Sequence, residues 1–153
     1  MSSAIYAADT FGNIIEVQCK ITKGLPSVQI VGLASKSIDE AKDRVRAAFH
    51  SSNLEFPKGR VLVNLSPADL PKEGSSYDLP IALSILQESG TIRAFTSNVF
   101  AIGELSLDGS IEPIRGMIGR LSAKFSGLGA VIVPSRNYAQ AVKSTNHKVI
   151  PIG

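Results

Sequence analysis

Apolar and polar residues alternate strictly over residues 15–21, which predicts a strand with one buried face and one solvent-facing face. β-rich segments over 3–8 and 13–22 flank Asp9 to Asn13, whose composition predicts a hairpin turn. Further strands are predicted over 27–31, 60–65, 98–103, 130–133 and 148–150.

Helical spacing of apolar residues from Ile38 onwards predicts a helix that reaches about His50. Ser37 and Glu40 have the S-x-x-E spacing of a capping box at its start. A second helix, apolar on nearly all sides, is predicted to begin with Asp78 as its N-cap and to end at Gly90. Further helices are predicted to end near Ser126 and to cover 135–144, the latter with its own serine, Ser135, as the cap. Interleaved strands and helices after an antiparallel start predict an α/β class, a two-layer α+β sandwich with a mixed sheet.

The length of 153 residues and the hydrophobic fraction of 44% predict a single folded domain over residues 1–153. The apolar runs fall short of the ~18 residues that span a bilayer, and the N-terminus lacks the pattern of a signal peptide. We therefore expect a cytoplasmic protein with no membrane partner. The sequence still resembles a strand at its last residues, so we expect a domain cut from a longer chain.

The titratable residues predict little metal or thiol chemistry. The chain has one cysteine and two histidines, and their spacing matches no recognised metal site, so no metal is expected. Cys19 lies in the alternating segment and is expected to be a buried strand residue. The net charge of +3 is compatible with an anionic partner but does not require one.

The stretch from Asn64 to Leu86 carries the most promising chemistry. It leaves an apolar strand, passes through a loop with prolines and a glycine, and enters the apolar helix. Ser75 and Ser76 bring hydroxyls to a helix N-terminus, where free backbone N–H groups form anion sites and oxyanion holes. The alternative is that the two serines only cap the helix.

Two segments resemble the Lon protease domain. Pro71 to Ser76 is similar to the Lon segment that carries the serine nucleophile, and Gly103 to Ile114 is similar to a hairpin of the Lon domain. A closer resemblance covers nearly the whole chain. The run N-L-S-P-A-D-L-P-K-E-G, followed by Y-D-L-P-I-A-L, is similar to the N-terminal, Lon-protease-like domain of the magnesium-chelatase-like AAA+ ATPases, the group that includes the competence protein ComM and YifB.

The resemblance implies the fold of ribosomal protein S5 domain 2 and a following AAA+ motor. The sequence contains no G-x-x-x-x-G-K-[ST] loop, so ATP and magnesium are expected in the missing AAA+ domain and no cofactor is expected in this segment. The resemblance also implies a homo-oligomer, a hexameric ring, in the full-length protein.

A Lon-type protease needs a serine nucleophile and a neutral lysine that accepts its proton. The serine position falls on Ser76, but alignment through the hairpin places Ile118 at the lysine position. Arg115 and Arg120 stay protonated and cannot serve as the base, and Lys124 lies six residues too far along. This segment is therefore predicted to be non-catalytic, with Ser76 as a vestigial candidate in a motif loop made of Pro71, Lys72, Glu73, Gly74, Ser75, Ser76 and Asp78.

The leading hypothesis is an accessory domain that organises an AAA+ ring and contacts DNA in branch migration and recombination during natural transformation. The expected DNA-binding residues, whose change to glutamate is predicted to leave folding intact, are Arg44, Arg46, Lys72 and Arg120. The alternatives are an ATP-dependent, Lon-like serine peptidase domain and a metal-chelatase subunit.

Overall fold

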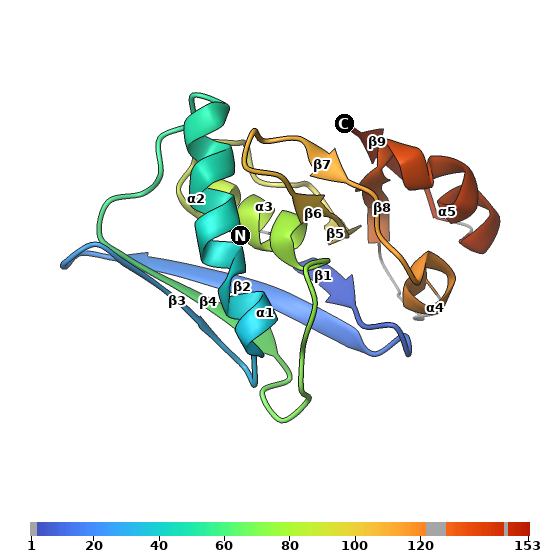
Figure 1. The fold of residues 1–153 in the computed structure, drawn as a ribbon, viewed down its shortest axis with the longest axis horizontal. Helices are drawn as coiled ribbons and strands as arrows, with labels where there is room; N and C mark the ends of the chain where they lie inside the picture. Colours follow the sequence, from blue (N-terminus) through green and yellow to red (C-terminus); the bar gives the residue numbers. More distant parts are fainter. Residues whose placement is uncertain (1–2, 122–127, 146) are drawn as a thin grey trace.

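The computed structural model describes residues 3–121, 128–145 and 147–153. Strands and helices interleave in it as the sequence predicts (Figure 1). The elements are β1 (Ile5–Ala8), β2 (Ile14–Thr22), β3 (Ser27–Val31), α1 (Lys36–Asp39), α2 (Ala41–Ser51), β4 (Arg60–Ser66), α3 (Asp78–Glu88), β5 (Asn98–Ala101), β6 (Glu104–Leu105), β7 (Ile111–Glu112), α4 (Met117–Leu121), β8 (Leu128–Pro134), the 3-10 helix η1 (Ser135–Asn137), α5 (Tyr138–Ser144) and β9 (Val149–Ile152).

The main sheet is mixed, which confirms the predicted α/β class. Among the described residues it has seven strands in the order β3-β4-β2-β1-β5-β8-β9. β2 runs antiparallel to β1 and β4, whereas the other neighbouring strands run parallel to each other. In the β2–β4 pair, Val17 lies opposite Leu65 and Cys19 opposite Val63. Strands β6 and β7 form a separate hairpin, as the Asp108-Gly109 turn predicts.

Helices cover opposite faces of the sheet at its two ends. Ala7 packs in the core formed with α1, α2 and α3, whereas the next residue, Ala8, packs in the core formed with α4 and α5. Successive strand side chains point to opposite faces, so the two helix groups lie on opposite sides of the sheet. Each end of the sheet is thus a two-layer arrangement, and the turn after Ala8 lies where the two arrangements meet.

The helix predicted to begin at Ser37 is two helices in the structure, because α1 ends at Asp39 and α2 begins at Ala41. Ser35 is the N-cap of α1 and makes no side-chain capping bond, so the predicted capping box is wrong. The predicted serine cap of the 135–144 helix is also wrong, since η1 precedes α5 there without a side-chain cap. In the described part of the chain, no helix has the length and apolar character needed to cross a membrane.

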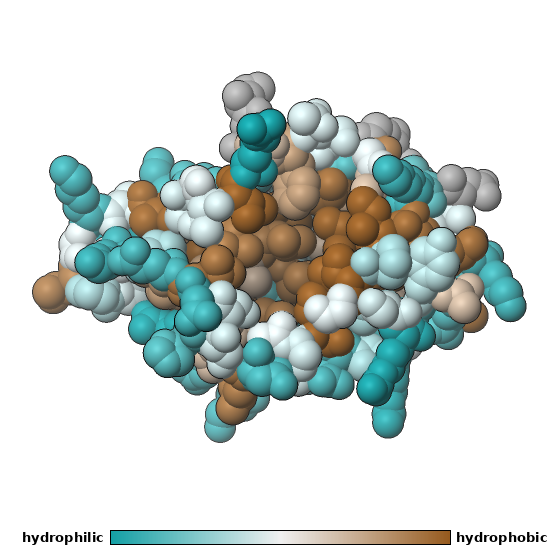
Figure 2. Space-filling model, turned by 90° about the horizontal axis from the view of Figure 1, so that it is seen from above, coloured by the Kyte–Doolittle hydropathy of each residue, from teal (hydrophilic) through white to brown (hydrophobic). Residues whose placement is uncertain are grey.

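One face of the molecule carries apolar side chains at its centre. Figure 2 shows them on the face that is uppermost in Figure 1, with hydrophilic residues around them. One core cluster on the α3 side of the sheet keeps several partly exposed members, which are Leu83, Phe95, Ile111, Ile150 and Ile152. A nucleic-acid surface needs clustered cations, so the centre of this face is poorly suited to phosphates.

Candidate functional site

The loop that follows β4 is fixed against the loop that follows β3. The Lys72 N–H donates to the Leu33 carbonyl over 3.1 Å, and the Ser35 N–H donates to the Lys72 carbonyl over 2.9 Å. Gly32, just after β3, allows its backbone to lie close to β4, because a Cβ at this position would lie 2.2 Å from the Leu65 carbonyl oxygen. These backbone contacts hold the motif loop in place.

The Lys72 amine fixes the same loops from inside. Its side chain is 1% exposed, and its Nζ donates to the Gly32 carbonyl over 2.7 Å and to the Pro67 carbonyl. Burial lowers the pKa of Lys72, and the charge of Asp69 reverses only part of this lowering. The amine therefore acts as a link between two loops, and it is not available at the surface for the DNA contact that the sequence suggested.

Ser37 supports the motif loop. Its hydroxyl oxygen accepts a hydrogen bond from the Gly74 N–H over 2.9 Å and lies 2.7 Å from the Ser35 hydroxyl oxygen. The residue predicted to cap its own helix thus holds a glycine 37 positions later in the chain. This contact joins α1 to the middle of the motif loop.

Ser76 is 4% exposed, at the end of the motif loop that leads into α3. Its carbonyl accepts a hydrogen bond from the Gly103 N–H over 3.1 Å, and the Ser75 carbonyl accepts one from the Asp78 N–H over 3.1 Å. Tyr77 is the N-cap of α3 and makes no side-chain capping bond, so the predicted capping roles of Ser75, Ser76 and Asp78 are wrong. Within the described residues, neither a lysine nor a histidine side chain hydrogen-bonds to the Ser76 hydroxyl.

The Asp78 carboxylate is buried and bonded to two other elements. Arg44 donates to it from Nε over 2.6 Å and from Nη2 over 3.0 Å, and the Leu105 N–H donates over 3.1 Å. Burial raises the pKa of Asp78 although Arg44 and Leu105 lower it, whereas the hydrogen bond to Asp78 raises the pKa of Arg44. Both pKa values are raised, which favours the charged guanidinium but disfavours the charged carboxylate, because the carboxylate is the more deeply buried partner.

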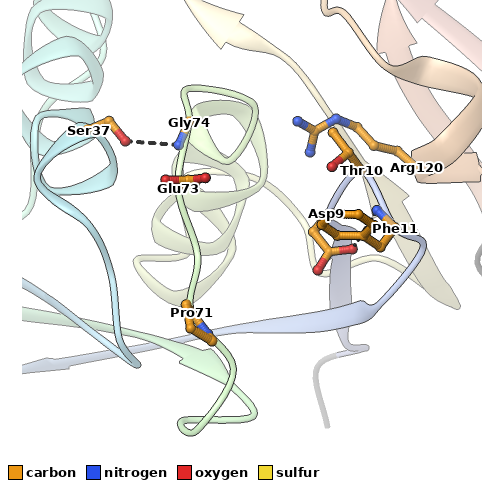
Figure 3. Close-up of a pocket in the computed structure, with 8 residues that line it drawn as sticks. All are labelled: Asp9, Thr10, Phe11, Ser37, Pro71, Glu73, Gly74 and Arg120. Carbon is orange, nitrogen blue, oxygen red and sulfur yellow. Dashed lines mark hydrogen bonds between the residues drawn. The ribbon is translucent and has the colours of Figure 1, made fainter.

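A cleft of about 480 Å³ opens beside the motif loop. One wall is the motif loop with Ser37, and the other is the β1–β2 turn with Arg120 of α4 (Figure 3). The lining residues are Asp9, Thr10, Phe11, Ser37, Pro71, Glu73, Gly74 and Arg120. Phe11 is 87% exposed at this cleft. The cleft thus combines an apolar side chain with groups of both charges.

Helix α4 directs Arg120, and not Ile118, into this cleft. Ile118 is 65% exposed and lines a different groove, formed with Ala139, Gln140, Lys143 and Ser144 of α5. Arg120 is 8% exposed and donates from Nη1 to the Ala8 carbonyl over 2.8 Å. Lys124 lies outside the described residues. The position expected for the catalytic base therefore lies outside the cleft.

The four cations expected to contact DNA do not form one open face. Arg44 is bound to Asp78, Lys72 is buried, and Arg120 lies within the cleft. Arg46 is exposed, with its guanidinium carbon 4.9 Å from the centre of the Phe56 ring. The expectation that all four can be changed without affecting the fold is not supported by these contacts.

The described residues contain no group of three or more histidine, cysteine, aspartate or glutamate side chains that could hold a metal ion. Cys19 is a free, partly buried cysteine in β2, where the sequence placed it. Burial raises the pKa of the Cys19 thiol to about 12, with a smaller contribution from Glu88. The thiolate is thus scarce at neutral pH.

Sequence reasoning located one wall of the cleft and missed the other. The sequence pattern identifies Thr10 and Phe11 only as parts of a turn, and Arg120 only as a rejected base and an expected DNA contact. The sequence does indicate that Phe11 is exposed, since a large apolar residue in a turn has little core to pack against. For Arg120 no local pattern distinguished a buried guanidinium from a surface one.

The fold and the motif loop place the chain in a known class. Residues 17–137 match the family model of subunit ChlI of Mg-chelatase, and the chain belongs to this family. It is 42% identical to an uncharacterized protein of Mycobacterium tuberculosis over 134 residues, which is 85% of this chain and 26% of that protein.

Two further relatives have names. The chain is 40% identical to YifB of Escherichia coli over 124 residues, which is 80% of this chain and 24% of YifB. It is 36% identical to the competence protein ComM of Haemophilus influenzae over 129 residues, which is 84% of this chain and 25% of ComM. The chain thus spans about a quarter of the length of these relatives.

Proposed function

We propose that this chain is a non-catalytic accessory domain of a magnesium-chelatase-like AAA+ ATPase. The position of Ile118 carries this proposal. An isoleucine cannot accept a proton, and its side chain lines the α4–α5 groove and not the cleft beside the motif loop. Loss of the activating base commonly costs a factor of roughly 10⁴ or more in rate.

Fluorophosphonate labelling tests the non-catalytic role directly. The chain and its Ser76→Ala variant are treated with a tagged fluorophosphonate, which reacts with activated serines, and labelled peptides are identified by mass spectrometry. We expect no label on Ser76, because the residue is buried and its hydroxyl has no lysine or histidine partner among the described residues. Stoichiometric label on Ser76 that disappears in the alanine variant would favour the Lon-like peptidase alternative.

The remaining three quarters of the parent protein would supply ATP and magnesium binding and assemble the hexameric ring. In that arrangement this domain organises the ring. Support comes from the membership of the family and from the partial coverage of YifB and ComM. A chelatase activity has less support, since the described residues hold no metal-ligand cluster.

We place the DNA contacts of such a parent, in branch migration or recombination, mainly outside this domain. Of the four expected cations, Arg46 alone is both exposed and free of an ion pair among the described residues. Anisotropy of a labelled four-way junction with the full-length parent tests this placement. We expect the Arg46→Glu parent to bind the junction as tightly as the unchanged protein, and a tenfold loss of affinity would locate a DNA contact here.

A further inference from the structure

The charges of this chain are segregated along the main sheet. Residues 17–38 and 56–68 contain lysines and an arginine but no aspartate or glutamate, although the whole chain has 13 acidic residues. These two segments carry β3, β4 and most of β2, which are neighbours at one end of the sheet. The fold therefore brings together two stretches that both lack negative charge.

One face of these three strands is open to solvent. Ile30, Val61 and Val63 pack in the core formed with α1, α2 and α3, so the side chains at alternate positions point to the opposite face. On that face lies a shallow hollow of about 220 Å³. Its exposed lining residues are Lys20, Thr22, Ser27, Gln29, Arg60 and Leu62. We call this surface the basic face.

The two cations of the basic face lie close together. Lys20 is opposite Leu62 in the β2–β4 register, so Arg60 is its diagonal neighbour at roughly 7–8 Å. Within the described residues neither cation makes an ion pair. Glu16, on the same side of β2, is four residues from Lys20, which is about 13 Å along the strand. Two like charges without a neighbouring carboxylate favour an anion at this place.

The other end of β4 leads to an acidic surface. Asp69 and Glu73, in the loop that follows β4, are exposed, and neither makes an ion pair among the described residues. The sequence has a cation between them, Lys72, but the fold buries its amine against the carbonyls of Gly32 and Pro67. The loop thus presents two carboxylates to solvent, and we call it the acidic loop.

The basic face and the acidic loop lie at opposite ends of one strand. β4 runs from Arg60 to Ser66, which is about 20 Å at the usual rise per residue. Figure 1 shows the start of β4 near the β2–β3 turn, and the acidic loop continues from the arrowhead of β4. Ion pairs between the two surfaces therefore form between copies of the chain and not within one copy.

We propose that the basic face binds the acidic loop of a second copy of this chain, with Asp69 and Glu73 of one copy beside Lys20 and Arg60 of the next. Leu62, 41% exposed between the two cations, adds apolar contact. The contact joins two different surfaces, so further copies can add until a ring closes. The inference rests on the proposed ring and names the surfaces by which this domain organises it.

A second copy fits the basic face better than a nucleic-acid strand does. Affinity for nucleic acid grows with the number of phosphates that a protein neutralises, and two cations line the hollow. The acidic loop supplies two carboxylates, which match these cations in number and come from the chain itself. Complementary charges of this kind select a partner and fix its orientation more than they add affinity.

Sedimentation equilibrium of the 153-residue chain tests the contact. The face variant carries Lys20→Gln and Arg60→Gln, and the loop variant carries Asp69→Asn and Glu73→Gln. We expect the unchanged chain to associate at about 50 mM salt and about tenfold more weakly at about 500 mM, because salt screens exposed charges. Each variant should associate about tenfold more weakly than the unchanged chain at the lower salt concentration.

Mixing the two variants tests the direction of the contact. The face variant keeps the acidic loop and the loop variant keeps the basic face, so a head-to-tail contact gives a one-to-one complex that cannot extend. We expect this complex to form as tightly as a pair of unchanged copies. In ¹H–¹⁵N NMR spectra of the mixture, the labelled face variant should show shifts at the Gly74 amide, and the labelled loop variant at the Gln29 and Leu62 amides.

A matched control separates the contact from net charge. Lys143→Gln with Lys148→Gln removes the same charge from exposed positions at the other end of the sheet and should leave association unchanged. An unchanged chain that stays monomeric at about 1 mM, full association by either variant, or no complex in the mixture would overturn the proposal. Tight binding of a short DNA duplex that the face variant loses would overturn it in favour of nucleic acid. None of these outcomes changes the labelling of Ser76, which tests the non-catalytic role by itself.

Discussion

The guanidinium of Arg44 and the carboxylate of Asp78 form a two-pronged ion pair between α2 and α3, with N–O distances of 2.6 and 3.0 Å. The same carboxylate accepts the Leu105 N–H of β6. One buried side chain therefore joins two helices and the β6–β7 hairpin. Arg44 is part of this connection and is not a free surface cation.

We expect Arg44→Glu to lower the free energy of unfolding by about 3 kcal/mol or more. The change leaves the Asp78 carboxylate buried without its cation and adds a like charge beside it. Urea denaturation followed by circular dichroism measures the loss. The control is Arg46→Glu on the same helix, where an exposed cation over an aromatic ring contributes about 0.5–1 kcal/mol. Similar small losses in both variants would contradict the structural role of Arg44.

Lys72→Glu should also destabilise the fold strongly. A carboxylate in this place would face the carbonyl oxygens of Gly32 and Pro67, which can only accept hydrogen bonds. We expect a loss of about 3 kcal/mol or more in thermal or urea unfolding. Lys58→Glu, which breaks an exposed ion pair with Glu55, is the control and should change stability by about 0.5 kcal/mol or less. A Lys72→Glu variant as stable as this control would refute the burial of the amine.

Ile118→Lys should fold normally and remain inactive as a peptidase. The side chain is exposed in the groove with α5, so a lysine there stays solvated and changes stability by about 0.5 kcal/mol or less. Its amine would lie in the groove with α5, which Ser76 does not line. Thermal unfolding and hydrolysis of a fluorogenic peptide measure the two properties. A variant that gains Ser76-dependent hydrolysis would show that position 118 does face the nucleophile.

Alkaline conditions should destabilise the chain partly through Cys19. The ordinary pKa of a thiol, 9.0, applies to the unfolded chain, whereas the folded value is about 12. Stability from this group is therefore fully present below pH 9.0 and declines as the pH rises toward about 12, because only the unfolded chain releases the proton. Urea midpoints across this range should fall less steeply for Cys19→Ser. Tyr77, with a pKa raised to about 12 from 10.0, accounts for part of the remaining slope.

If the urea midpoint of the Cys19→Ser variant fell with pH as steeply as that of the unchanged chain, the thiol would have the same pKa in the folded and the unfolded state. Midpoints measured at neutral pH serve as the reference for each protein, since the thiol does not titrate there.

The strands were the most predictable part of the fold. The alternation in β2 directly reflects its two-sided environment, so its limits of 14–22 differ from the prediction by one residue. Helix starts were predicted poorly. Ser37 and Asp78 are residue types that often cap helices, but they bond to Gly74 and Arg44, which lie 37 and 34 positions away. Local patterns hold no information about such partners.

The candidate site was half predictable for the same reason. The motif loop stands out in the sequence because prolines, a glycine and two serines follow one another there. The opposite wall comes from the β1–β2 turn and from α4, and it faces the loop only because strand β1 lies in the middle of the sheet. A residue such as Arg120 becomes part of the site through topology.

The buried amine of Lys72 gives the chain an internal reporter of loop opening. Reagents that acylate lysines react with amines that water can reach, and this one is enclosed by the two carbonyls that it joins. Modification of Lys72 therefore requires the loops after β3 and β4 to separate. Its rate of acetylation, compared by mass spectrometry with that of exposed Lys58, would follow the local opening of the motif loop without any engineered probe.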